Sequence, residues 1–228
     1  MSPSSRIPEI DFFRGTAIIL MVVFHTVFDL ASFYGWPLDY MNGFWYLEGR
    51  ASAVLFMLIS GISSTLSRNP VHRGIKVFGA GLIITAVTFF FSPEVYIRFG
   101  ILHLLGTGMI TAPFFSRYGA TLLATAGMTV IAVGNWTADL IAATATLVPL
   151  GIKPPGFASL DYYPLFPWLG VVLLGMAAGK LLYPDRQPLW PAASGYRPVR
   201  WLICLGRHSL VIYLVHQPVL LVLLKMIL

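Results

Sequence analysis

The chain has 228 residues, of which 57% are hydrophobic and only 11% are charged, and its mean hydropathy is +0.78. These values lie outside the range of soluble globular domains and indicate a polytopic membrane protein. The formal charge of +6 is typical of basic cytoplasmic loops, so we expect the lipid bilayer and no nucleic acid as a partner. The single cysteine, Cys204, excludes an internal disulfide and a cysteine-ligated metal cluster.

Long apolar runs follow one another along the chain and predict an all-α transmembrane helix bundle in a single domain, residues 1–228. A membrane-crossing helix needs about 20 apolar residues. By this rule the expected spans are residues 11–33, 50–67, 74–91, 98–115, 118–136, 164–183 and 201–226. The apolar piece at 137–150 is short enough to favour a re-entrant or interfacial segment, although counting it would give eight spans instead of seven.

The positions of the basic residues predict the orientation. With a cytoplasmic N-terminus, seven spans place eleven of the 15 lysines and arginines inside and leave Arg50, Arg98, Lys153 and Lys225 outside. This bias follows the positive-inside rule and predicts a multi-pass protein of the cell membrane.

The first span carries ionisable residues in an otherwise apolar run. At about 100° per residue, Asp11, Arg14, His25 and Asp29 share one face of a helix. Arg14 and His25 are roughly 16 Å apart along the axis, since a helix rises 1.5 Å per residue. His25 and Asp29 are one turn apart, so the carboxylate could orient the imidazole as it does in a general base. Intramembrane ionisable residues are functional candidates.

Further polar residues lie in the later spans. His103 is expected at a depth similar to that of His25, and Asp161 precedes the 164–183 span on the same outer side. At the cytoplasmic start of the last span, Arg200 and Arg207 share a face next to His208, and two guanidinium groups there suit phosphate oxygens. Deeper in that span, Pro218 predicts a kink beside His216. The histidines lack metal-binding spacing, so we predict no metal site.

The first span, with ten residues between Arg14 and His25, resembles the opening helix of the transmembrane acyltransferase superfamily. Within it, the chain is most similar to the heparan-alpha-glucosaminide N-acetyltransferase-like bacterial family. The supporting stretches are residues 25–29, 99–103, 161–168 and 205–218.

The resemblance implies an acetyl-CoA donor that enters from the cytoplasm and an amine or hydroxyl acceptor, such as a sugar, on the far side. Together with the residue pattern, it predicts a catalytic set of His25, Asp29, His103 and Asp161. The expected donor-binding set is Arg14, Arg200, Arg207, His208 and His216. Direct transfer and an acetyl-histidine intermediate are both open, as is homo-oligomerisation.

Two other function classes fit part of the pattern. A proton-coupled transporter or channel would use His25, Asp29, His103 and His216 as a relay. A structural membrane subunit would instead pair these residues off in a dry interior. We find no internal repeat of the kind that many transporters contain.

Overall fold

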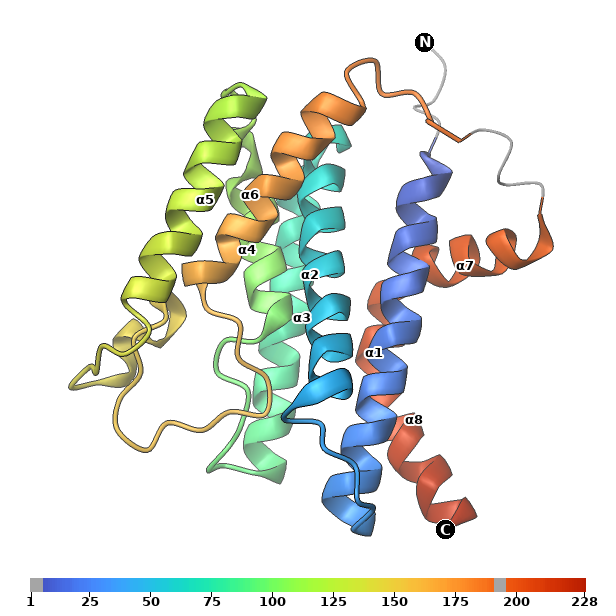
Figure 1. Cartoon of the computed structure of the whole chain (residues 1–228), viewed down its shortest axis with the longest axis vertical. Helices are drawn as coiled ribbons and strands as arrows, with labels where there is room; N and C mark the ends of the chain where they lie inside the picture. The colour runs from blue at the N-terminus through green and yellow to red at the C-terminus, as the bar shows by residue number, and fades with distance from the viewer. Residues whose placement is uncertain (1–5, 191–195) are drawn as a thin grey trace. The chain divides into compact units, whose positions relative to one another are not determined.

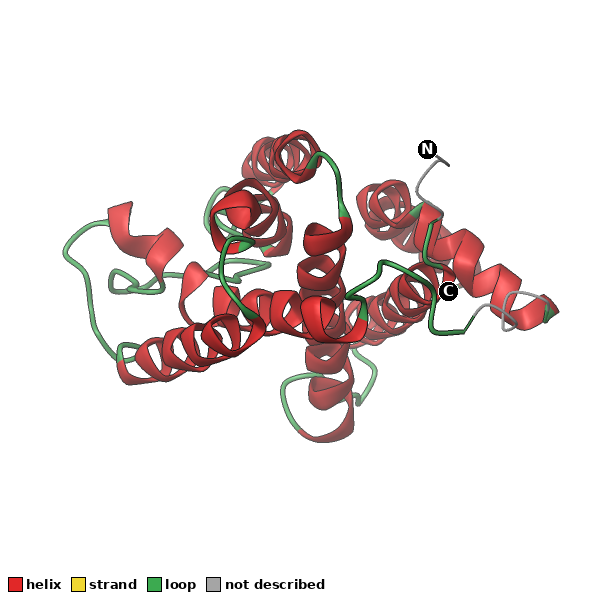
Figure 2. Ribbon diagram, turned by 90° about the horizontal axis from the view of Figure 1, so that it is seen from above, coloured by secondary structure: helices red, strands yellow, loops and turns green. Residues whose placement is uncertain are grey.

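A computed structural model describes residues 6–190 and 196–228, and in this part of the chain the regular structure is helical (Figure 2). The helices in Figure 1 are α1 (Pro8–Tyr34), α2 (Gly43–Leu66), α3 (Pro70–Phe91), α4 (Ile101–Phe115), α5 (Ala120–Trp136), the 3-10 helix η1 (Ala145–Leu150), α6 (Leu165–Leu182), α7 (Arg197–Arg207) and α8 (Ser209–Ile227). The all-α prediction is confirmed for the described residues.

The described residues form two compact units. The first lies within Met1–Phe56 and Asp185–Leu228, and the second is Met57–Pro184. The first unit therefore joins α1 and the start of α2 to α7 and α8, from the opposite end of the chain. The single domain predicted over residues 1–228 stays a prediction.

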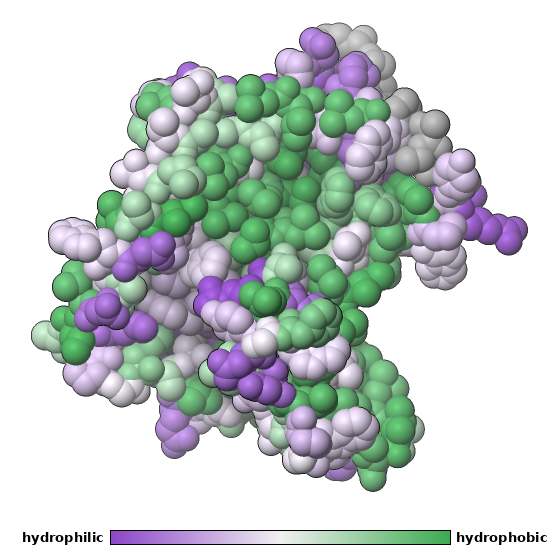
Figure 3. Space-filling model, viewed as in Figure 1, coloured by the Kyte–Doolittle hydropathy of each residue, from purple (hydrophilic) through white to green (hydrophobic). Residues whose placement is uncertain are grey.

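Among the described residues, five helices are long and apolar enough to cross a membrane, namely α1, α2, α3, α6 and α8. The predicted spans at 98–115 and 118–136 correspond to α4 and α5, which are apolar but shorter. The piece at 137–150 contains only the six-residue η1 and provides no spanning helix. The described helices expose many large apolar side chains, drawn in green in Figure 3, as expected for contact with lipid.

The start of α2 differs from its prediction. It begins at Gly43, seven residues before the predicted start at residue 50. Glu48 and Arg50 lower the local hydropathy, which moved the predicted boundary, but both are good helix formers and the helix continues through them. Hydropathy marks an apolar run here and not the true end of the helix.

The predicted last span, 201–226, is wrong as a single helix, because the chain breaks at His208 into α7 and α8. The His208 Nδ1 donates a hydrogen bond to the carbonyl oxygen of Cys204, 2.9 Å away, at this junction. The break separates a short amphipathic helix from an apolar one, so their environments differ. At Pro218, where a kink was expected, α8 continues to Ile227.

The helix α7 crosses α1 at close range (Figure 1). A Cβ atom added at Gly15 would collide with the backbone carbonyl of Leu202, and one added at Gly206 would collide with that of Asp11. Two glycines facing each other's helix let the backbones approach closely, as small residues do in membrane proteins. This crossing positions Arg207 over the N-terminal part of α1.

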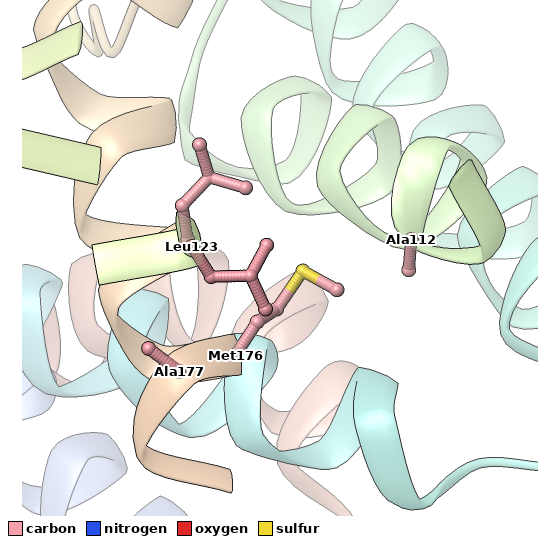
Figure 4. Packing of buried hydrophobic residues seen from close by; sticks show 5 residues of the cluster. Ala112, Leu123, Met176 and Ala177 are labelled. Carbon is pink, nitrogen blue, oxygen red and sulfur yellow. The ribbon is translucent and has the colours of Figure 1, made fainter. Parts of the chain in front are cut away.

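The second unit has its own hydrophobic core. It is formed by five residues from α4, α5 and α6, of which Figure 4 labels all but Leu173. Met176 is fully buried, and its side chain lies beside Leu123 and extends toward Ala112 of α4. Glycines also bring α6 close to α2, since a Cβ at Gly61 would meet the carbonyl of Val172.

Candidate functional site

The polar face of α1 contacts the C-terminal helices at two levels. Near the start of α1, Asp11 pairs with both Arg14 and Arg207, and we call these three residues the arginine cluster. Further along α1, His25 and Asp29 meet His216 and Gln217 of α8, and we call these four the histidine cluster. Both clusters therefore join the two ends of the chain within the first unit.

In the arginine cluster, a buried carboxylate links two guanidinium groups. The Arg14 Nη1 donates a hydrogen bond to the Asp11 Oδ1 at 2.8 Å, and the Arg207 Nε lies 3.6 Å from the Asp11 Oδ2. Asp11 thus forms an ion pair with Arg14, three positions along the same helix, and also brings two predicted donor-binding arginines together. The Arg207 side chain remains 48% exposed, so it is accessible to an anion.

The other predicted donor-binding residues are placed differently. Arg200 is exposed on α7, one heptad before Arg207, which puts both side chains on a similar face. His208 is exposed at the junction between α7 and α8. His216 lies beside His25 and not among the arginines. Its predicted role in donor binding stays a prediction.

The histidine cluster brings together two imidazole rings. The ring centres of His25 and His216 are 4.7 Å apart, and the ring planes are inclined by 65°. Asp29 and His216 are both buried. The His216 Nδ1 lies 2.7 Å from the carbonyl oxygen of Tyr213, and the Gln217 Nε2 donates a hydrogen bond of 2.6 Å to the Asp29 Oδ1.

The predicted hydrogen bond between Asp29 and His25 is not formed. The Asp29 Oδ1 accepts a hydrogen bond from Gln217, and within the described part of the chain its Oδ2 has no hydrogen-bond partner. One helical turn brings two residues to the same face, but it does not decide which neighbouring helix each side chain faces. Asp29 therefore connects α1 to α8 in this structure, and its predicted role in orienting the His25 ring stays a prediction.

Several polar atoms of the histidine cluster are buried and unpartnered. In residues 6–190 and 196–228, these are the His25 Nδ1, the Asp29 Oδ2, the His216 Nε2 and the Gln217 Oε1. Buried polar atoms in proteins nearly always have a partner, and exceptions are often found at functional sites. Their gathering on two facing helices marks this cluster as the candidate site.

His103 lies in the second unit and is fully engaged there. Its Nδ1 accepts a hydrogen bond from the backbone N–H of Gly100 at 3.2 Å, so its Nε2 carries the hydrogen and faces the Thr85 Oγ1 at 3.3 Å. The ring also stacks on Phe99, with 5.4 Å between the ring centres. Through its bond to the Gly100 N–H, His103 caps the N-terminus of α4.

Asp161 caps the same helix from a distant loop. Its Oδ2 accepts the backbone N–H of Ile101 at 2.9 Å, close to where a Cβ at Gly100 would lie. A carboxylate at a helix N-terminus satisfies a free N–H and interacts favourably with the helix dipole. The structure thus gives His103 and Asp161 helix-capping contacts, whereas the sequence predicted them as catalytic.

Gln217 and the Tyr213 carbonyl were missed by the sequence interpretation. The available signal was an amide next to His216 within an apolar helix, where a polar side chain usually faces another helix. Tyr213 offers no such signal, because the contacting group is its backbone oxygen.

Among the described residues, no group of three His, Cys, Asp or Glu side chains is placed to hold a metal ion. In comparisons with known proteins, no curated protein and no solved structure matches the chain. A family model described as heparan-alpha-glucosaminide N-acetyltransferase, catalytic, matches residues 6–218. This match includes both clusters and all the predicted site residues. The chain therefore belongs to the heparan-alpha-glucosaminide N-acetyltransferase catalytic family and is a multi-pass membrane acyltransferase.

Proposed function

We propose that the chain transfers an acetyl group from acetyl-CoA to an amine acceptor, with the histidine cluster as the site of transfer. The observation that carries this proposal is the contact between His25 and His216, in a region matched by an acetyltransferase family model. Imidazole is the side chain most often used to move protons in acyl transfer.

The arginine cluster supplies the donor-binding end of the proposed site. Three charges, two positive and one negative, leave a net positive group with Arg207 half exposed. Guanidinium groups bind phosphate oxygens through paired hydrogen bonds. Arg14 and His25 are roughly 16 Å apart along α1, at 1.5 Å per residue. An extended pantetheine arm suits this separation, with the phosphates at the arginines and the thioester at the histidines.

The unpartnered atoms of the histidine cluster favour an amine over a hydroxyl as acceptor. Among the described residues, the Asp29 Oδ2, the Gln217 Oε1 and the His216 Nε2 are three hydrogen-bond acceptors without a donor. A primary amine can donate two hydrogens and its ammonium form three, whereas a hydroxyl donates one. The family description names a glucosaminide, so an amino sugar is the first acceptor to test.

The transfer step follows from these positions. The acceptor nitrogen attacks the thioester carbonyl carbon and forms the new C–N bond, while His25 takes a proton from that nitrogen. The tetrahedral intermediate then expels the CoA sulfur as the C–S bond breaks. The His25 imidazolium returns the proton to the thiolate, which leaves as CoA thiol. Transfer through an acetyl-histidine uses the same residues in two steps.

The proposed orientation has the donor on the cytoplasmic side of the cell membrane and the acceptor on the outer side. It rests on the distribution of basic residues and on a cytoplasmic N-terminus. In this orientation the arginine cluster lies at the cytoplasmic surface and the histidine cluster in the outer half of the membrane. The acetyl group would then cross most of the bilayer within the protein.

The test is transfer of radiolabelled acetyl from acetyl-CoA to glucosamine by purified protein in liposomes. We expect labelled N-acetyl product with wild type and at least a 100-fold lower rate with His25→Ala, since general-base catalysis contributes about 10²–10⁴-fold. His72→Ala, at an exposed position of α3, is the matched control. Folded wild-type protein that consumes no acetyl-CoA with any amine or hydroxyl acceptor would refute the proposal. Proton flux through it without acetyl transfer would favour the transporter.

A further inference from the structure

The protonation of His216 is set by its backbone contact. A carbonyl oxygen only accepts hydrogen bonds, so the His216 Nδ1, at 2.7 Å from the Tyr213 oxygen, carries a hydrogen. In the neutral ring the lone pair is then on Nε2. His216 therefore presents a hydrogen-bond acceptor of known position, and this Nε2 is buried with no partner among the described residues.

The His25 ring also has a buried nitrogen without a partner. Its Nδ1 forms no hydrogen bond in the described part of the chain. When His25 takes a proton, both ring nitrogens carry hydrogens, and a buried N–H needs an acceptor. The Asp29 Oδ1 accepts its hydrogen bond from Gln217, and in the described residues the Asp29 Oδ2 forms no hydrogen bond with His25. The neighbouring acceptor is the His216 ring, 4.7 Å away between ring centres.

We propose that His216 is the positioning residue for His25, accepting the His25 Nδ1–H at its own Nε2 during transfer. This inference rests on the proposed function. The proton taken from the acceptor goes to the His25 Nε2, and His216 stabilises the resulting imidazolium while its own Nδ1–H stays on the Tyr213 carbonyl. The rings touch in the free protein, and such hydrogen bonds often tighten only when substrate binds.

The bond between Asp29 and Gln217 holds this pair in place. Asp29 lies one helical turn after His25 on α1, and Gln217 directly follows His216 on α8. The 2.6 Å hydrogen bond between them therefore fixes the two helices against each other next to the imidazole contact. In this arrangement the orienting role expected of the Asp29 carboxylate passes to an imidazole and a backbone carbonyl.

The experiment compares His216→Leu with His216→Gln. The leucine cannot accept the His25 hydrogen, whereas the glutamine side-chain oxygen can. We expect kcat to fall at least 50-fold in His216→Leu. The kcat of His216→Gln should be at least tenfold higher than that of His216→Leu. The dissociation constant of acetyl-CoA should stay within threefold of wild type in both variants. His72→Leu is the matched histidine control, since His72 is exposed on α3.

Nitrogen-15 spectra of histidine-labelled protein give a readout that does not depend on turnover. In wild type, the His216 signals should report hydrogen on Nδ1 and a free Nε2. Three results would overturn the inference. These are an unchanged kcat in His216→Leu, an equal loss of kcat in the leucine and glutamine variants, and hydrogen on the His216 Nε2. A parallel loss of acetyl-CoA binding would do so as well, since it would return His216 to the donor-binding set. Wild type without acetyl transfer would instead refute the proposed function, whatever the spectra show.

Discussion

Asp29 and Gln217 are 188 positions apart in the chain, yet the Gln217 Nε2 donates a hydrogen bond of 2.6 Å to the Asp29 Oδ1. Asp29 is fully buried, so this bond satisfies part of a carboxyl group that water does not reach. It also brings the neighbouring residues His25 and His216 together from opposite ends of the chain.

Replacing Gln217 by Met should destabilise the first unit. The change keeps the side-chain length but leaves the Asp29 carboxyl without its partner, which costs about 1–3 kcal/mol for a buried group. Thermal unfolding in detergent should therefore show a lower Tm. Gln187→Met, at an exposed position, should leave the Tm unchanged. Equal effects of the two substitutions would contradict the buried hydrogen bond.

Replacing Gly206 by Ala should disturb the crossing of α1 and α7. The added methyl group would collide with the backbone carbonyl of Asp11, and overpacking of this kind costs about 1–3 kcal/mol. We expect a lower Tm and weaker acetyl-CoA binding, because Arg207 follows Gly206 directly. Gly79→Ala provides the control, since its Cβ would meet open space. A Gly206 variant with wild-type Tm would show that the helices are further apart.

Replacing Asp161 by Ala should reduce stability without removing the chemistry. The lost bond to the Ile101 N–H is a helix cap, which contributes about 0.5–2 kcal/mol. We expect a lower Tm but a kcat within threefold of wild type when the assay is run well below the Tm. Asp139→Ala, at an exposed position, controls for loss of charge. A 100-fold loss of kcat in folded Asp161→Ala would restore it to the catalytic set.

Tyr162 should make the stability of the protein pH-dependent only in the alkaline range. Its hydroxyl donates a hydrogen bond of 2.8 Å to the carbonyl oxygen of Val148, and burial raises its pKa from 10.0 to about 12. The folded state thus holds this proton more tightly than the unfolded state. The contribution is fully present below pH 10.0 and is lost as the pH rises toward 12.

The measurement is the Tm of wild type and Tyr162→Phe between pH 8 and pH 11. The Tm difference should be constant below about pH 10 and should shrink above it, because the wild type loses its extra stability there. Tyr118→Phe, at an exposed position, is the control. A difference that grows above pH 10 would mean that the phenol is not held in its protonated form.

The sequence predicted the elements well where hydropathy and helix-starting residues agree. The span at 164–183 corresponds to α6 (Leu165–Leu182), which begins directly after Pro164. The prediction failed at His208, where the amphipathic helix α7 precedes the last apolar run and a hydropathy window includes part of it in the same span. A break of this kind depends on the contacts of α7 with α1, which hydropathy does not report.

For the site, the sequence proposed His25, Asp29 and His216 as candidates but not which of them would meet, and it did not propose Gln217. Helical period fixes which residues of α1 share a face, whereas the pairing of Asp29 with Gln217 depends on how α8 packs. His103 and Asp161 were predicted as catalytic because ionisable residues in apolar runs are often functional. The contact of Asp161 with the start of α4 depends on the path of the loop before α6, which the sequence does not specify. The contact of His103 is local, between its ring and the Gly100 N–H.

The central claim is that donor binding and chemistry occur at two separate levels of α1. Its most direct test is calorimetric titration of acetyl-CoA into purified wild type, Arg207→Ala and His25→Ala in detergent. We predict saturable binding to wild type. Binding to Arg207→Ala should be about tenfold or more weaker, because a hydrogen bond to a charged group contributes about 1.5–3 kcal/mol. The dissociation constant of His25→Ala should stay within threefold of wild type. Absence of binding to folded wild type would contradict the account, as would loss of binding in His25→Ala with none in Arg207→Ala.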